Sequence, residues 1–127
     1  MAQARTSLLG RGADAEATAA VVAKFFRALG DPTRLRLLEF LLGDEHTVNE
    51  CVAHVGLAQS RVSTHLSCLA DCGYVEVRRA GRYAFYRVSD QRVADLVRLA
   101  RALAADNACA LSECRRIDAH THEPAIR

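Results

Sequence analysis

The chain has 127 residues, half of them hydrophobic, which is enough for one compact core and too little for two ordinary domains. Its net charge of +2 does not indicate a nucleic-acid-binding protein, but 16 of its 17 basic residues are arginines, which suit bidentate contacts to phosphate and guanine. We find no secretory signal and no apolar run near the roughly 20 residues of a membrane span, so we expect a cytoplasmic protein with no membrane partner.

Two helices are predicted at the beginning of the chain. Apolar residues that recur at spacings of three and four predict the first over residues 16–29. Gly30 ends this helix. Asp31 is placed as the N-cap of the second helix, with Pro32 at its first position, where the missing N–H is not needed. The second helix is expected to run to Gly43.

A helix-turn-helix is predicted next. Thr47 is a natural N-cap for a short third helix, and Glu50 follows three residues later, as a capping box requires. Gly56 breaks this helix, and a fourth helix is predicted over residues 58–71. Its apolar stripe consists of Val62, Leu66 and Leu69. Two short helices joined by a tight glycine-containing turn are typical of a motif whose second helix enters the major groove of DNA.

The second half of the chain predicts a hairpin and a long helix. β-rich runs at 74–78 and 83–88, around a glycine-containing loop at 79–82, predict the hairpin. Apolar residues at helical spacing predict a final helix over about 90–106. The expected fold class is therefore mainly α with a small β-hairpin, a winged helix-turn-helix in the order α-α-α-α-β-β-α.

Three segments are expected along the chain. Residues 1–15 form a flexible N-terminal segment, and residues 16–106 form the DNA-binding and dimerisation domain. The polar segment 107–127 is a C-terminal tail without predicted regular structure. A long amphipathic helix at the end of so small a chain needs a partner surface, and a second copy of the chain provides one.

The polar face of the fourth helix and the arginines of the hairpin are the candidate DNA-binding residues. On the helix these are Gln59, Ser60, Arg61, Ser63, Thr64 and His65. On the hairpin they are Arg78, Arg79, Arg82 and Tyr83. Polar side chains can also simply coat a solvent-exposed face. The preceding helix and turn and the flanking arginines favour DNA contact, because binding requires phosphate neutralisation.

Four stretches of the chain resemble the ArsR/SmtB family of bacterial metal-sensing repressors. They are ALGDPTRLRLL at 28–38, SRVSTHLSCL at 60–69, GYV at 73–75 and GRYAFY at 81–86, within a similarity that covers about 20–104. The resemblance implies a homodimer that pairs through its first and last helices. It also implies a repressor of double-stranded operator DNA that releases the DNA when metal binds.

Cys68 and Cys72 are the first candidate metal ligands. Cysteines four residues apart on a helix lie on the same side, one turn apart, and can chelate one ion. The alternative is two small buried apolar residues. Within the family the spacing resembles the CmtR-type cadmium and lead sensors, which implies a third thiolate from the tail of the other subunit. Cys109, Cys114 or both are the tail candidates.

The ion expected at such a site is soft. Thiolates attract Cd²⁺ and Pb²⁺, which we expect as effectors, while Zn²⁺, Hg²⁺ and As(III) remain open. A thiol-redox switch without metal is a further alternative. An enzyme would need a nucleophile or an acid–base pair that converges in a pocket. We do not expect an enzyme, because the sequence contains no catalytic signature of this kind.

The remaining cysteine and the histidines have other expected roles. Cys51 occupies the place where arsenic sensors of the family carry a Cys-x-Cys pair, but Ala53 replaces the second cysteine, so we expect Cys51 to face the core. His65 is expected to contact DNA or to support the ligands. We expect His46 and His54 to be polar surface residues. In the tail, His120 and His122 are candidate accessory ligands of the metal ion.

Overall fold

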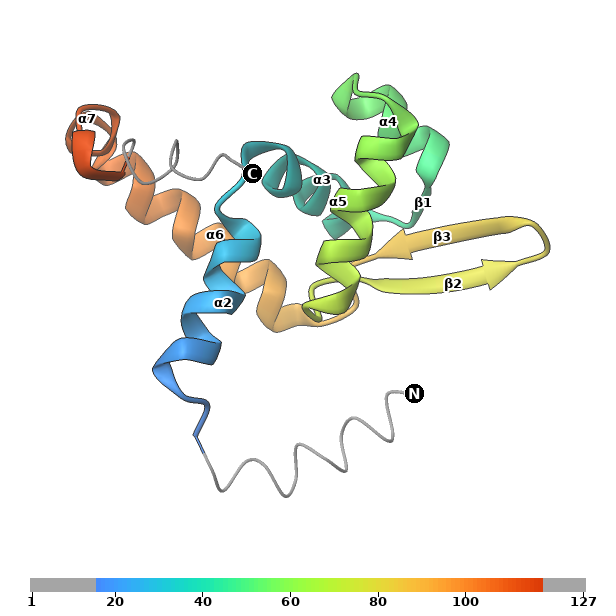
Figure 1. Ribbon diagram of the computed structural model, residues 1–127, viewed down its shortest axis with the longest axis horizontal. Helices are drawn as coiled ribbons and strands as arrows, with labels where there is room; N and C mark the ends of the chain where they lie inside the picture. The colour runs from blue at the N-terminus through green and yellow to red at the C-terminus, as the bar shows by residue number, and fades with distance from the viewer. Residues whose placement is uncertain (1–15, 118–127) are drawn as a thin grey trace. The chain divides into compact units, whose positions relative to one another are not determined.

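The computed structural model describes residues 16–117, which divide into two compact units, one up to Ser89 and one from Asp90 (Figure 1). The elements of the first unit are α2 (Ala19–Leu29), α3 (Pro32–Gly43), β1 (His46–Thr47), α4 (Val48–Val55), α5 (Gln59–Asp71), β2 (Glu76–Ala80) and β3 (Tyr83–Arg87). Those of the second unit are α6 (Gln91–Asp106) and α7 (Ala108–Ser112). The winged helix-turn-helix fold is confirmed. The expected segment 1–15 and the tail histidines His120 and His122 lie outside the described residues.

Side-chain caps determine where the first helices begin. The Thr18 hydroxyl accepts a hydrogen bond from the Val21 N–H at 3.2 Å, so α2 begins at Ala19 and not at residue 16 as predicted. The Asp31 carboxylate accepts from the Arg34 N–H at 3.0 Å, and α3 has its predicted bounds.

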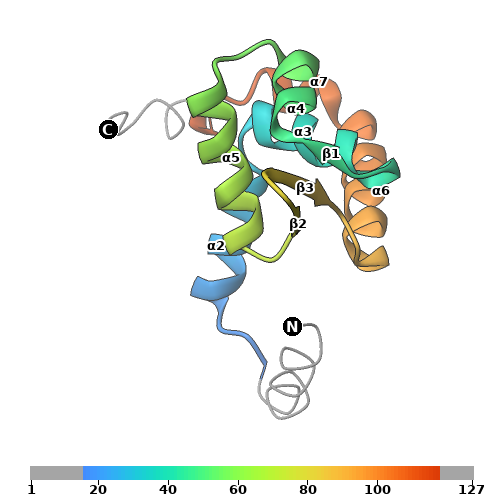
Figure 2. The ribbon, with the colours of Figure 1, turned by 90° about the vertical axis from the view of Figure 1, so that its right-hand side faces the viewer.

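The predicted capping box is present at the start of α4. The Thr47 hydroxyl accepts from the Glu50 N–H at 3.2 Å, and the Glu50 carboxylate accepts from the Thr47 N–H at 3.0 Å. Gly56 ends the helix with φ 73°, a left-handed conformation that glycine adopts without steric strain. This turn brings α4 against α5, and α3 also packs against both helices (Figure 2).

The fourth predicted helix is shorter by one residue than expected. Ala58 is the N-cap of α5 and not its first residue, and Cys72 is its C-cap. The predicted stripe is buried completely, because Val62, Leu66 and Leu69 have no exposed surface. The core of the first unit adds residues of the preceding helices, namely Leu37, Leu38, Leu41, Cys51 and Val55.

The first strand of the β2–β3 hairpin begins and ends two residues later than predicted, and the turn is tighter. Residues 79 and 80 belong to β2, and Ala80 pairs with Tyr83, so the turn has two residues in place of the predicted loop 79–82. Gly81 has φ 61°, which a tight hairpin turn requires at this position. Tyr74, predicted as strand, instead stacks on Phe25 of α2 with ring centroids 4.3 Å apart.

Two elements were not predicted. The strand β1 pairs antiparallel with β3, so the sheet has three strands in the order β1-β3-β2. The tail contains α7, whose Leu111 N–H donates to the Asn107 carbonyl at 2.9 Å. A two-residue strand has no detectable periodicity, and α7 is too short to show a pattern of its own. Within residues 16–117, no helix is both long and apolar enough to cross a membrane.

Candidate nucleic-acid interface and thiol pair

The candidate reading helix α5 exposes most of its predicted polar residues. Gln59, Ser60, Arg61 and Thr64 are exposed, whereas Ser63 and His65 are half-buried. The Thr64 hydroxyl donates to the Ser60 carbonyl at 3.0 Å, so its oxygen remains available as an acceptor. A shallow hollow of about 360 Å³ lies between Ser60, Arg61, Thr64 and His65.

The N-terminus of α5 has no side-chain cap, because Ala58 occupies the N-cap position. Within residues 16–117, the first turn of α5 therefore has no side-chain acceptor like the one that Asp31 supplies to α3 and Thr47 to α4, although the Arg61 N–H bonds to the Ala58 carbonyl at 3.1 Å. A helix N-terminus carries partial positive charge, and N–H groups of this kind bind phosphate. Arg61, the third residue of the helix, adds a full positive charge in this first turn.

His65 contacts the preceding helices through Arg34 of α3. The Arg34 Nη1 lies 3.3 Å from His65 Nδ1, while its Nε donates to the Ala28 carbonyl at 2.6 Å and its Nη2 to the Arg27 carbonyl at 3.3 Å. Burial is the main cause of a lowered pKa of His65. The sequence contained Arg34 within the family-like stretch, but no spacing or periodicity indicated its contact with a histidine 31 positions later.

The arginines of the hairpin differ in their contacts. Arg78 donates from Nη2 and Nε to the two carboxylate oxygens of Glu45 at 2.7 and 3.1 Å, and its guanidinium lies 4.5 Å from the Phe85 ring centroid. Arg82 lies at the turn, 5.7 Å from the Tyr83 ring centroid. Within residues 16–117, neither Arg79 nor Arg82 pairs with a carboxylate, so these charges remain available to phosphates, whereas the charge of Arg78 is partly compensated.

The Cys68 and Cys72 thiols lie together at the C-terminal end of α5. The Cys72 N–H donates to the Cys68 carbonyl at 3.0 Å, so the helical backbone geometry extends to Cys72 although the helix ends at Asp71. Both side chains are half-buried, and they lie close enough for each thiol to affect the ionisation of the other. Burial and the neighbouring Cys68 raise the pKa of Cys72, and Lys24 of α2 opposes this effect. Two adjacent thiolates repel each other, and a bound cation would relieve that repulsion.

Cys68 and Cys72 are the two candidate metal ligands of the first unit, and they do not form a complete metal site. Within the described residues, no three His, Cys, Asp or Glu side chains come together as a group that could hold a metal ion. Cys109 is exposed on α7, and Cys114, two residues past the end of this helix, is half-buried. Both belong to the second unit.

The remaining cysteine and two of the histidines pack against apolar or aromatic side chains. Cys51 is buried in the core, as expected, and burial raises its pKa to about 11. His54 is exposed, as expected, and His46 is half-buried; both also stack on the Phe40 ring, with centroid separations of 4.0 and 3.8 Å. Their nearly parallel rings at these distances place them on opposite faces of Phe40.

A helix-turn-helix followed by an arginine-bearing hairpin is the architecture of a DNA-binding transcriptional regulator. The family described as "Bacterial regulatory protein, arsR family" matches residues 31–77. A "Probable mercury resistance operon repressor" of Streptomyces lividans is 65% identical over 95 residues, which cover 75% of this chain and 76% of that protein. The regulator CmtR of Mycobacterium tuberculosis H37Rv is 40% identical over 92 residues, covering 69% and 78%.

Solved structures give the same result. Rv0081 of M. tuberculosis superimposes with a TM-score of 0.69 at 31% identity, covering 77% of this chain and 99% of that one. The homodimeric winged helix-turn-helix domain Mb0332 of Mycobacterium bovis has a TM-score of 0.63 at 32% identity, covering 69% and 81%. The chain belongs to the arsR family of bacterial regulatory proteins. It is a transcriptional regulator and not an enzyme.

Proposed function

We propose that this chain is a repressor that binds operator DNA as a homodimer and releases it when a soft metal ion binds its cysteine thiolates. The observation that carries the proposal is the position of Cys68 and Cys72 at the end of α5. A ligand held by these thiols acts directly on the helix whose other end carries the candidate DNA-binding residues.

The exposed apolar side chains of α2 support a homodimer. Val21 and Phe26 are 57% and 52% exposed, and Val22 is exposed beside them, although a helix in water normally turns such residues inward. The solved domain from M. bovis is homodimeric. A second copy that covers this face would place two α5 helices around a two-fold axis, as a palindromic operator requires.

The chemistry of the site favours Cd²⁺ or Pb²⁺. Cys68 and Cys72 supply two sulfur ligands, and Cys109, Cys114 or both, from the same or the partner subunit, would supply the remainder. Three thiolates without a strong fourth ligand suit large soft ions and not Mg²⁺ or Ca²⁺, which prefer oxygen.

Hg²⁺ is the second candidate effector. The observation that favours it is the 65% identity with the probable mercury resistance operon repressor of S. lividans. Hg²⁺ is also a soft ion that thiolates attract. Both candidates use the same pair of cysteines, so they differ in the ion and not in the site.

The available binding energy is sufficient for a switch. Changing a conformational ratio from about 1:99 to 99:1 requires roughly 5.5 kcal/mol of differential binding. Thiolate metal sites release about 10 to 16 kcal/mol in total. Partial coupling between the ion and the position of α5 would therefore release the DNA.

The experiment replaces cysteines singly and measures two quantities for each variant. Metal affinity is followed by sulfur-to-metal charge-transfer absorption, and release from a fluorescent operator by anisotropy, both with reductant present. Cys68→Ser and Cys72→Ser should abolish release and leave DNA binding of the metal-free protein intact. Cys51→Ala is the matched control and should respond normally. A Cys68→Ser/Cys72→Ser variant that still releases DNA with metal contradicts the site.

Titration with individual ions distinguishes the effectors. Cd²⁺, Pb²⁺, Hg²⁺, Zn²⁺ and As(III) are compared for the concentration that releases half of the operator. Release by Cd²⁺ or Pb²⁺ at lower concentration than by Hg²⁺ supports the first candidate. Release that needs only an oxidant and is reversed by dithiothreitol would favour a redox switch.

A further inference from the structure

The Arg34 guanidinium joins three helices. It donates to the carbonyls of Arg27 and Ala28 at the C-terminal end of α2, and it lies against His65 on α5. Arg34 is itself the third residue of α3, and its own N–H is held by the Asp31 carboxylate. The orientation of this guanidinium is therefore determined by several contacts and does not depend on His65.

This orientation determines the protonation state of His65. A guanidinium has five N–H donors and no acceptor, so the His65 Nδ1 that faces it must accept the hydrogen bond. An Nδ1 that accepts carries no proton, and the ring is then neutral with its proton on Nε2. The charged groups that act on the ring are Asp31, which favours protonation, and Arg34 and Arg61, which oppose it.

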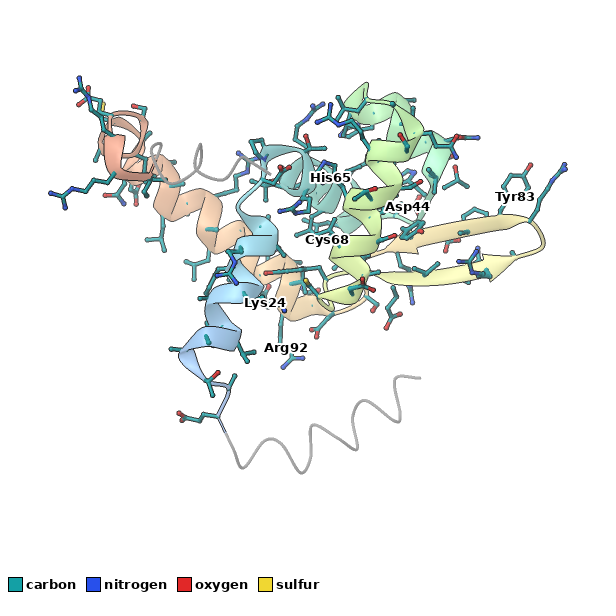
Figure 3. All side chains as sticks on the ribbon, viewed as in Figure 1. Lys24, Asp44, His65, Cys68, Tyr83 and Arg92 are labelled. Atoms are coloured by element: carbon teal, nitrogen blue, oxygen red, sulfur yellow. The ribbon has the colours of Figure 1, made fainter. Side chains whose placement is uncertain are left out.

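The other ring nitrogen is available for a ligand. Within residues 16–117, His65 Nε2 has no hydrogen-bond partner, and the His65 side chain lines the shallow hollow beside Ser60, Arg61 and Thr64. Figure 3 shows His65 on the same side of α5 as Cys68, about one turn nearer the N-terminus. An N–H donor next to the Arg61 guanidinium and the Ser60 hydroxyl suits an anionic oxygen, and in DNA that group is a backbone phosphate.

We propose that Arg34 is a positioning residue for DNA binding, which holds His65 in the tautomer that donates from Nε2 to a DNA phosphate. The proposal rests on the proposed repressor function. Loss of Arg34 frees the ring to place its proton on Nδ1, and Nε2 then presents a lone pair to a negatively charged oxygen. Arg34 does not itself touch DNA, so its effect passes through His65.

The first measurement is the tautomer, which does not require DNA. The ¹⁵N chemical shifts of the His65 ring, assigned with a His65→Gln variant, should show Nε2 protonated and Nδ1 unprotonated in the native protein. Arg34→Lys should populate the other tautomer, because a single ammonium cannot reach both carbonyls of α2 and Nδ1 together. A native protein with its proton on Nδ1 would overturn the proposal.

The second measurement is a double-mutant cycle on DNA affinity. Glutamine in place of His65 presents an N–H donor near the position of Nε2 and has no tautomers. Arg34→Met should weaken binding about tenfold in the native background, the loss expected for one hydrogen bond to a charged group, and less than about twofold in the His65→Gln background. Because the acceptor is a phosphate, the affinity for the operator and the affinity for an unrelated duplex should decrease by the same factor.

Arg36→Met is the matched control, since Arg36 lies two residues further on α3 and donates to the His54 carbonyl but contacts none of the described histidine rings. It should leave the His65 tautomer and DNA affinity unchanged. Equal weakening by Arg34→Met in both backgrounds would mean a structural role only and would overturn the proposal, as would a loss confined to the operator. Arg34→Lys serves the same cycle if Arg34→Met unfolds. A native protein with the expected tautomer that binds no duplex overturns the repressor function itself.

Discussion

The five cysteines of the chain differ widely in how deeply they are buried. Cys51 is enclosed by the core and its thiol titrates near pH 11, whereas Cys109 is exposed and Cys68, Cys72 and Cys114 are half-buried. Only the thiolate reacts with electrophiles and metals at a useful rate. The chain therefore separates one structural thiol from four chemically accessible ones.

Brief alkylation should label the native protein at every cysteine except Cys51. Burial prevents contact with the reagent and also disfavours the thiolate of this residue. Treatment with iodoacetamide at pH 8 followed by peptide mass spectrometry gives the extent at each position. Alkylation in denaturant is the control and should label all five. Labelling of Cys51 as fast as Cys109 in the native state would contradict its burial.

Acidification should destabilise the fold through His65. The folded pKa of His65 is lowered below its ordinary value of about 6.5, so the unfolded chain binds the proton first as the pH falls. Stability contributed by the neutral ring is complete above about pH 6.5 and is lost as the pH falls from there toward the folded pKa. The free energy of unfolding, measured in denaturant from pH 8 to 5, should fall more in the native protein than in His65→Gln. If the difference in the free energy of unfolding between the native protein and His65→Gln does not change with pH, the pKa of His65 is not lowered in the folded state.

At the scale of elements, the hairpin is attached to the helices at one end and free at its turn. Arg78 pairs with Glu45 in the segment before β1, while β1 itself pairs with β3. Arg82 lies at the turn, at the opposite end of the hairpin, and Figure 1 shows the hairpin extending away from the helices of its unit. The charge that is free to meet DNA is thus concentrated toward the tip.

Arg82→Ala should weaken binding to all DNA sequences alike and reduce the salt dependence, because one phosphate contact releases about one counterion fewer. The logarithm of the binding constant against the logarithm of salt concentration should have a slope smaller by about one. Arg78→Ala is the comparison and should change the slope less, because Glu45 already compensates its charge. If Arg82→Ala leaves affinity unchanged at every salt concentration, the hairpin does not contact phosphate.

At the scale of the whole molecule, two helices carry exposed apolar side chains. The apolar side chains of α2, together with Leu99 and Leu103 of α6, are exposed in the single chain. The exposure of these apolar side chains to water is unfavourable in free energy. The proposed homodimer would cover them and would also set the distance between two reading helices.

Phe26→Glu should therefore weaken dimerisation and, with it, operator binding. The substitution puts a charge at a position that is 52% exposed in the single chain but would be buried between two copies. Sedimentation velocity gives the dimer population, and anisotropy compares a full palindrome with one half-site. Val77→Glu on β2, 39% exposed, is the control and should remain dimeric. A native protein that is monomeric while bound to its operator would falsify the two-fold arrangement.

Local interactions made much of the fold predictable from the sequence. The Asp31 cap with Pro32, and the capping box of Thr47 and Glu50, act over three residues, and their atoms lie where the spacing predicted. The buried stripe of α5 follows from helical periodicity alone. The Cys68 and Cys72 pair was predictable for the same reason, because a spacing of four brings two side chains together on any helix.

Contacts between distant segments were decided only by the tertiary structure. Arg34 meets His65 across 31 positions and Arg78 meets Glu45 across 33, and neither residue type nor spacing indicates such a pair. The strand β1 exists because β3 offers its free edge, so two residues without strand periodicity become a strand. Periodicity and capping report interactions within one turn of the chain, whereas these contacts depend on how whole elements pack, which is why the sequence predicted the reading helix and not the arginine that orients its histidine.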